Sequence, residues 1–181
     1  MTEVVLLFGR PAVGKFTIGK LLAEELGYRL LHNHAVVDLV EALFPFGSAP
    51  FIKLREELWL AAVDAAIDAK LKGIILTFAP ESTVTDDFLP NLRRRGGLRL
   101  VELRCSEEEI ERRMRDASRA KFGKLRDPDF YRELNRQGVF SRPVMPPADI
   151  LSDVTAQDAT QAARSIARQL SSPSADSRSR S

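Results

Sequence analysis

Short apolar runs alternate with amphipathic stretches along most of the chain. Residues 4–8 and 74–78 are runs of apolar side chains, typical of strands buried on both faces of a parallel sheet. The predicted order is strand 4–8, helix 15–26, strand 28–31, helices 35–43 and 51–72, strand 74–78, helix 86–95, strand 98–104, helix 106–119, short helix 130–135, strand 150–151 and helix 156–170. This alternation predicts an α/β fold, with helices on both faces of a five-stranded parallel sheet.

Length and composition fit one domain of this kind. We expect it to cover residues 1–170 of the 181, because residues 171–181 are rich in Ser and Arg, lack large apolar side chains and read as a disordered tail. A net charge of +2 is too small to indicate a nucleic-acid or membrane partner, and no apolar run is long enough to span a bilayer. The single cysteine, Cys105, excludes an internal disulfide framework, and the first core strand leaves no room for a signal peptide. We therefore expect a cytoplasmic protein, as a monomer or weak dimer.

The segment after the first predicted strand carries the clearest chemistry. Its residues are Gly9, Arg10, Pro11, Ala12, Val13, Gly14, Lys15, Phe16 and Thr17. A G-x-x-x-x-G-K pattern between a strand and a helix indicates a phosphate-binding loop, in which backbone N–H groups and the helix N-terminus surround an anion. Lys15 is then placed to reach the outer phosphates of a nucleotide. The alternative is an ordinary strand-to-helix turn that contains two glycines and a lysine.

The residue after the lysine departs from the common pattern. Ser or Thr usually stands there and holds Mg²⁺ through its hydroxyl, whereas this chain has Phe16, with Thr17 one position later. The G-K-x-T ending resembles the adenylate-kinase form of the loop. That resemblance implies that Thr17 contacts phosphate and that the metal is held largely through water.

Polar residues follow the other predicted strands, at the sheet edge where ligands of parallel sheets bind. His32 and His34, the two histidines of the chain, follow the second strand, and Asp38 lies one helical turn beyond His34. We expect these three to bind an acceptor, with Asp38 preferred over His34 as the proton acceptor. Alternatively, they cap a helix and bond to loop backbone. Thr155 follows the fifth strand and is a candidate nucleotide contact.

Arg55 and Lys53 open the long helix predicted over residues 51–72. There, a cation could clamp an anionic group of the acceptor, and Arg55 is the candidate. A solvated helix face is the interpretation that we favour for both.

These features together resemble the small P-loop kinases, among them shikimate kinase, gluconate kinase, chloramphenicol phosphotransferase and the nucleoside monophosphate kinases. The resemblance extends to about residue 170 and is strong for bacterial P-loop proteins described as shikimate kinase-like or AAA-family ATPases, which have a similar G-K-x-T loop and a similar H-N-H after the second strand. It implies a P-loop NTPase fold, ATP and Mg²⁺ as cofactors, and a small-molecule acceptor. Shikimate kinase has Asp-x-Asp where this chain has His32 and His34, so specificity for shikimate itself is not supported.

A basic run follows the fourth strand. Its members are Arg112, Arg113, Arg115, Arg119, Lys121, Lys124 and Arg126. The resemblance implies a lid over about residues 112–128, with Arg113 near the nucleotide and Arg119 stabilising charge on the transferring phosphoryl group. The alternative is a charged, exposed helix.

Two functions remain open from the sequence. One is an ATP-dependent kinase that transfers the terminal phosphoryl group to a small molecule. The other is a nucleotide-binding regulatory or interaction protein with weak or no phosphotransfer. This alternative stays open because Phe16 replaces the usual metal ligand and two histidines replace acidic residues. Thr77 stands at the end of the third strand, where P-loop motors and GTPases place a metal-organising aspartate, so a mechanochemical ATPase is disfavoured.

Overall fold

The computed structural model describes residues 1–116, 125, 127–141 and 144–172. Its described strands are β1 (Glu3–Phe8), β2 (Arg29–Leu31), β3 (Gly73–Phe78), β4 (Leu98–Arg104) and β5 (Ile150–Asp153). They form one five-stranded, all-parallel sheet in the order β2-β3-β1-β4-β5. The predicted α/β fold is confirmed. Because β1 is central, the loop that follows it opens at the middle of the sheet edge.

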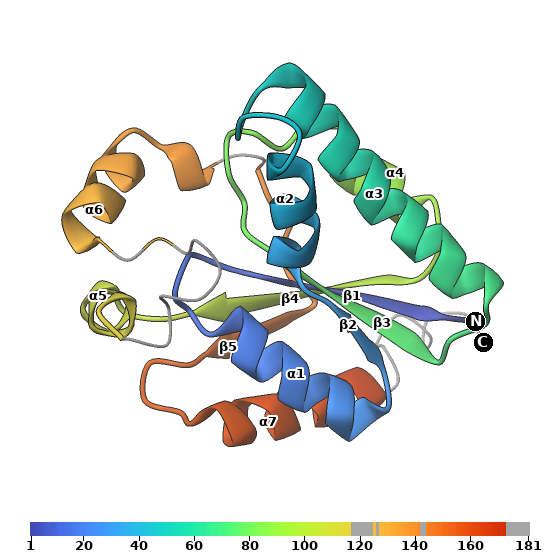
Figure 1. Ribbon diagram of the computed structural model, residues 1–181. Helices are drawn as coiled ribbons and strands as arrows, with labels where there is room; N and C mark the ends of the chain where they lie inside the picture. The colour runs from blue at the N-terminus through green and yellow to red at the C-terminus, as the bar shows by residue number, and fades with distance from the viewer. Residues whose placement is uncertain (117–124, 126, 142–143, 173–181) are drawn as a thin grey trace.

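Helices cover both faces of the sheet, as Figure 1 shows. On one face lie α1 (Lys15–Leu26) and α7 (Ala159–Ser171), and on the other lie α2 (Asn33–Glu41), α3 (Ala49–Asp68) and α4 (Phe88–Arg93). Beyond the carboxyl ends of the strands lie α5 (Glu107–Met114), α6 (Pro128–Arg136) and the short 3₁₀ helix η2 (Val139–Ser141). The three-layer arrangement follows from strands that are apolar on both faces.

The inward residues of the sheet divide between two cores. Val4, Leu6 and Phe8 of β1 pack with α2, α3 and α4, whereas Val5 and Leu7 pack with α1 and α7. All five side chains are at most 3% exposed. The alternation of β1 side chains between the two cores therefore fixes the strand firmly and gives the following loop a rigid base.

Several predicted boundaries need correction. The helix expected to reach Arg119 ends at Met114, and the helix expected from residue 156 begins at Ala159, because the Asp158 side chain caps it by accepting bonds from the N–H groups of Thr160 and Gln161. Of the predicted lid, residues 117–124 and 126 lie outside the described residues, as do residues 173–181 of the predicted tail.

Within the described part of the chain, no helix combines the length and the apolar character that crossing a membrane requires.

Candidate active site

A cavity of about 710 Å³ lies at the carboxyl edge of the sheet. One side is formed by the phosphate loop and the first turn of α1, and the other by α2, the loop after β3, α6 and η2. Its described lining residues are Pro11, Ala12, Gly14, Lys15, Phe16, Thr17, His32, Asn33, His34, Val37, Glu41, Phe46, Thr77, Ala79, Glu81, Arg113, Asp116, Leu125, Phe130, Leu134, Val139 and Phe140. The cavity thus brings together the residues that follow β1, β2 and β3.

The loop after β1 has a backbone that needs its glycines. Gly9 has φ +152°, and a Cβ there would lie 2.5 Å from the carbonyl oxygen of Leu103 on β4. Ala12 and Gly14 also have positive φ values, 64° and 106°. Gly14 is the N-cap of α1 and has no side chain to cap the helix, so the positive end of the helix dipole lies at the cavity wall. This is the geometry of an anion-binding loop.

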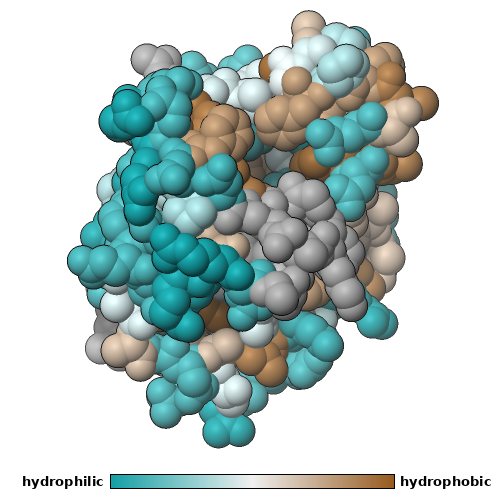
Figure 2. Space-filling view, turned by 60° about the vertical axis from the view of Figure 1, so that its left-hand side comes forward, coloured by the Kyte–Doolittle hydropathy of each residue, from teal (hydrophilic) through white to brown (hydrophobic). Residues whose placement is uncertain are grey.

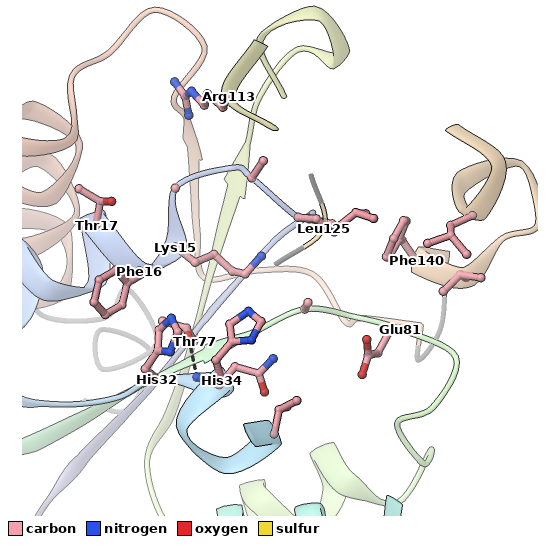
Figure 3. A pocket seen from close by; sticks show the side chains of 18 of the residues that line it. Lys15, Phe16, Thr17, His32, His34, Thr77, Glu81, Arg113, Leu125 and Phe140 are labelled. Atoms are coloured by element: carbon pink, nitrogen blue, oxygen red, sulfur yellow. Dashed lines mark hydrogen bonds between the residues drawn. The ribbon is translucent and has the colours of Figure 1, made fainter. Parts of the chain in front are cut away.

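The Lys15 side chain folds back over this loop. Its Nζ donates hydrogen bonds of 2.7 Å to the carbonyl oxygens of Gly9 and Arg10. Figure 3 shows the ammonium group inside the cavity, above His34. A cation held at this position faces the space between the loop and the opposite wall.

Arg113 of α5 ties the phosphate loop to two other segments. Its guanidinium donates to the carbonyl oxygen of Val13 at 3.0 Å, to that of Val154 at 2.8 Å and to Glu109 Oε1 at 2.7 Å. Hydrogen bonds from Arg112 and Arg113 lower the pKa of Glu109 to about 2. Arg113 therefore borders the cavity, and it also holds the loop in place.

Arg10 points away from the cavity instead. It forms an ion pair with Glu107 at the start of α5, and its Nη1 donates to the Tyr131 hydroxyl at 3.3 Å. The same hydroxyl donates to Glu107 Oε2 at 3.0 Å, and the tyrosine side chain is fully buried. Burial raises the pKa of Tyr131. Arg10 thus links the phosphate loop to α5 and α6 and does not line the cavity.

The two histidines stack at the base of the cavity. The ring centroids of His32 and His34 lie 5.2 Å apart, and Phe16 meets His32 edge-on at 4.4 Å. His32 is the N-cap residue of α2 but makes no capping bond through its side chain. The Asn33 N–H at that helix start donates to the Thr77 hydroxyl at 2.9 Å, drawn as a dashed line in Figure 3. Phe16 therefore packs against the histidine wall, and Thr77 fixes α2 against β3.

Asp38 does not share this position. It is exposed and is absent from the cavity lining, whereas His34, Val37 and Glu41 line the cavity from one face of α2. Asp38, four residues after His34, lies beside that face on its solvent-exposed side. Contrary to expectation, Asp38 therefore does not line this cavity beside His34. The cavity carboxylates that sequence reasoning missed are Glu41, Glu81 and Asp116.

Arg55 is fully buried, so its expected solvated position is wrong, although Lys53 is exposed as expected. Its Nη1 donates to Glu81 Oε1 at 2.7 Å, its Nη2 donates to the Thr83 carbonyl oxygen at 2.7 Å, and its guanidinium lies over Phe51 and Trp59 at 5.0 and 4.9 Å. Burial lowers the pKa of Arg55, and the nearby Glu81 and Glu56 carboxylates oppose this. Arg55 lies behind the cavity wall, and Glu81 lines it.

Several solved structures have an architecture similar to that of this chain. A gluconokinase from Sinorhizobium meliloti 1021 has a TM-score of 0.63 at 18% identity, over 98% of this chain and 95% of that one. Shikimate kinase from Acinetobacter baumannii, in complex with shikimate, has a TM-score of 0.60 at 19% identity, over 94% and 93%. The APS kinase CysC of Mycobacterium tuberculosis, in complex with AMPPNP and APS, has a TM-score of 0.60 at 14% identity, over 94% and 98%. The chain has the fold of the small P-loop kinases. No protein-family model matches it, and no curated protein matches its sequence.

Of two further candidate site residues, Thr155 and Thr17, only Thr17 lines the cavity. Thr155 is not among the cavity residues, since its hydroxyl accepts a bond of 3.0 Å from the Ser106 N–H and joins the ends of β4 and β5. Thr17 does line the cavity. Arg119, the predicted lid arginine, lies outside the described residues.

The far wall of the cavity is the part that the sequence did not indicate. It consists mainly of apolar side chains from segments distant in sequence: Phe46, Leu125, Phe130, Leu134, Val139 and Phe140. The Ser82 N–H donates to the Val139 carbonyl oxygen at 2.8 Å and joins the loop after β3 to η2. The exposure of Phe46 and Phe130, 50% and 53%, follows from their place on an open cavity.

Proposed function

We propose that this protein is a kinase that transfers the terminal phosphoryl group of ATP to a small-molecule acceptor. One observation carries the proposal: a single cavity contains both the phosphate loop with Lys15 and an opposite wall of imidazole, carboxylate and aromatic groups. A phosphate site joined to a second chamber suits a donor and an acceptor held in line, so that positioning supplies much of the catalysis. The kinases of the same fold support the proposal.

The phosphate loop and Lys15 would hold the nucleotide. Backbone N–H groups at the start of α1 and the Lys15 ammonium are suited to bind the outer phosphates and to stabilise charge that develops on them. Nucleotide binding would replace the bonds that Lys15 now donates to the Gly9 and Arg10 carbonyl oxygens. Arg113 would keep the loop in its binding geometry.

Thr17 remains our candidate for a protein ligand of Mg²⁺, through its hydroxyl, because it lies at the start of α1 on the phosphate-loop side of the cavity. The described residues contain no cluster of three or more His, Cys, Asp or Glu side chains that could hold a metal. We therefore infer that the ion is bound mainly by phosphate oxygens and water. When bound, Mg²⁺ neutralises part of the phosphate charge.

We assign the proton acceptor to His34 rather than Asp38. His34 lines the cavity, and Figure 3 shows its ring directed toward the side of the cavity where Lys15 ends. A neutral imidazole near the terminal phosphate can take the proton of an acceptor hydroxyl as the phosphoryl group transfers. His32, stacked on His34, would orient its ring.

Transfer of labelled phosphate tests the proposal. The full chain is incubated with ATP labelled at the γ position, Mg²⁺ and a small-molecule extract of cytoplasm, the location that we infer for it, and products are separated by mass. We expect a labelled compound other than ATP and inorganic phosphate, formed by the wild type and not by Lys15→Ala. ATP binding without any labelled product would favour the nucleotide-binding regulatory protein instead.

A further inference from the structure

The cavity opposite the phosphate loop has a distinctive charge pattern. Among its described lining residues, the basic ones are Lys15 and Arg113, and both belong to the phosphate-loop side. On the opposite side, the charged residues are Glu41 on α2 and Glu81 in the loop after β3. Apart from the imidazoles of His32 and His34, the described residues on that side therefore offer an anionic acceptor no lysine or arginine to pair with.

The orientation of Glu81 strengthens this pattern. Its Oε1 accepts bonds from Arg55 at 2.7 Å and from the Thr83 hydroxyl at 2.9 Å, which fixes the carboxylate. Its Oε2 accepts no hydrogen bond from the described residues, and the side chain is 18% exposed on the cavity side of the loop (Figure 3). A carboxylate oxygen that is held in place and has no hydrogen-bond donor is well suited to accept a bond from an ammonium or hydroxyl group of a ligand.

A second acceptor atom lies beside it. Asn33 lines the cavity, and its Oδ1 is buried with no hydrogen-bond donor among the described groups. An unsatisfied buried oxygen is costly unless a ligand supplies the donor.

The rest of the chamber is apolar. Phe46, Phe130, Leu134 and Phe140 contribute side chains from three separate segments. Figure 2 shows apolar side chains among the polar ones on this face of the molecule. Such walls fit a ring or a short aliphatic chain.

We propose that the acceptor is a neutral or cationic molecule with an apolar ring or chain, whose hydrogen-bond donors reach Glu81, rather than an anion. The inference rests on the proposed function, since it treats this chamber as the acceptor site. It separates this protein from enzymes whose acceptors carry a carboxylate or phosphate. Arg55, the candidate cation for clamping such a group, instead fixes the carboxylate that faces the cavity.

Three phenols of similar shape test the charge preference: tyramine, which is cationic, tyrosol, which is neutral, and 4-hydroxyphenylacetate, which is anionic. Their affinities for the full chain are measured by ligand-observed NMR titration, with and without saturating AMPPNP and Mg²⁺, which occupy the phosphate loop. We expect tyramine and tyrosol to bind at least tenfold more tightly than 4-hydroxyphenylacetate. If AMPPNP does not bind, the proposed function fails. The order of the three affinities on the nucleotide-free protein still tests this inference.

Substitutions of the cavity carboxylates test whether they cause this charge preference. Glu81→Gln should reduce the ratio of the tyramine affinity to the 4-hydroxyphenylacetate affinity several-fold. If Glu81→Gln does not fold, Glu41→Gln is tested in its place. Glu57→Gln is the control, because Glu57 is exposed on α3 and does not line the cavity. Equal or tighter binding of the anion, a ratio unchanged in the variants, or no binding of any probe would overturn the inference.

Discussion

Arg55 donates a hydrogen bond of 2.7 Å to Glu81, and the arginine is fully buried while the carboxylate borders the cavity. The pair joins the hydrophobic core under α3 to the wall of the candidate acceptor chamber. A charge that is buried and paired is costly to separate, because the partner that remains has lost its counter-charge and its hydrogen bonds. The pair therefore links the stability of the fold to the shape of the site.

Removal of the arginine should be strongly destabilising. We predict that Arg55→Ala lowers the free energy of unfolding by about 3 kcal/mol, as expected when one partner of a buried pair is lost. Arg55→Lys should fall between this variant and the wild type, since an ammonium cannot reproduce the planar geometry in which the guanidinium bonds to both Glu81 and Thr83. Urea denaturation measures both. Lys53→Ala is the control, with a change within about 0.5 kcal/mol. Equal stability of Arg55→Ala and the control would contradict the assignment.

Two glycines provide a matched test of the loop geometry. Gly9→Ala should cost about 2 kcal/mol or more, because its new Cβ would lie 2.5 Å from the Leu103 carbonyl oxygen at a positive φ. Gly97→Ala should stay within about 1 kcal/mol, because no atom lies within 4 Å of the added carbon. Denaturation gives the stabilities and calorimetry gives the ATP affinities. Two equally tolerated substitutions would show that the close contact between Gly9 and β4 is not needed.

The contribution of the Arg113–Glu109 ion pair to stability should be lost at low pH. The pKa of Glu109 is lowered from 4.5 to about 2, so the carboxylate contributes stability above about pH 4.5 that is lost as the pH falls toward 2. We predict that the wild type loses more stability than Glu109→Gln between pH 5 and pH 2, at roughly constant ionic strength. Thermal unfolding across this range measures the difference. Glu108→Gln is the control, since Glu108 is exposed and forms no ion pair among the described residues. Parallel curves for the wild type and Glu109→Gln would refute the linkage.

Two substitutions separate the candidates for the proton acceptor. Once an acceptor is identified, His34→Ala should lower kcat by about a hundredfold or more, the usual contribution of a positioned base. Asp38→Asn should stay near the wild-type rate, because Asp38 is exposed and does not line the cavity. Steady-state kinetics and ATP binding are measured on both. A large loss of kcat in Asp38→Asn alone would return the role to the carboxylate.

The elements that the sequence predicted best are those with local signals. The apolar run of β1, the G-x-x-x-x-G-K pattern and the H-N-H after β2 fixed the sheet, the phosphate loop and the histidine wall. Arg55 was misjudged because burial on the long α3 depends on what packs over it, here Glu81 and Thr83 from a loop about 26 residues away. Asp38 was misjudged because its i, i+4 spacing places it near His34 but does not reveal on which side of that helix face the cavity lies. The apolar wall from α6 and η2 has no local signal, since it exists only once these segments cross the sheet edge.

Lys15 provides the most direct test of whether this cavity is a nucleotide site. Calorimetric titration of ATP with Mg²⁺ into the wild type, Lys15→Ala and Lys20→Ala compares the loop lysine with an exposed lysine of the same helix. We predict that Lys15→Ala binds ATP at least tenfold more weakly than the wild type while its circular dichroism is unchanged, and that Lys20→Ala binds normally. Wild-type affinity in a folded Lys15→Ala protein would contradict the phosphate-loop assignment and, with it, the proposed kinase.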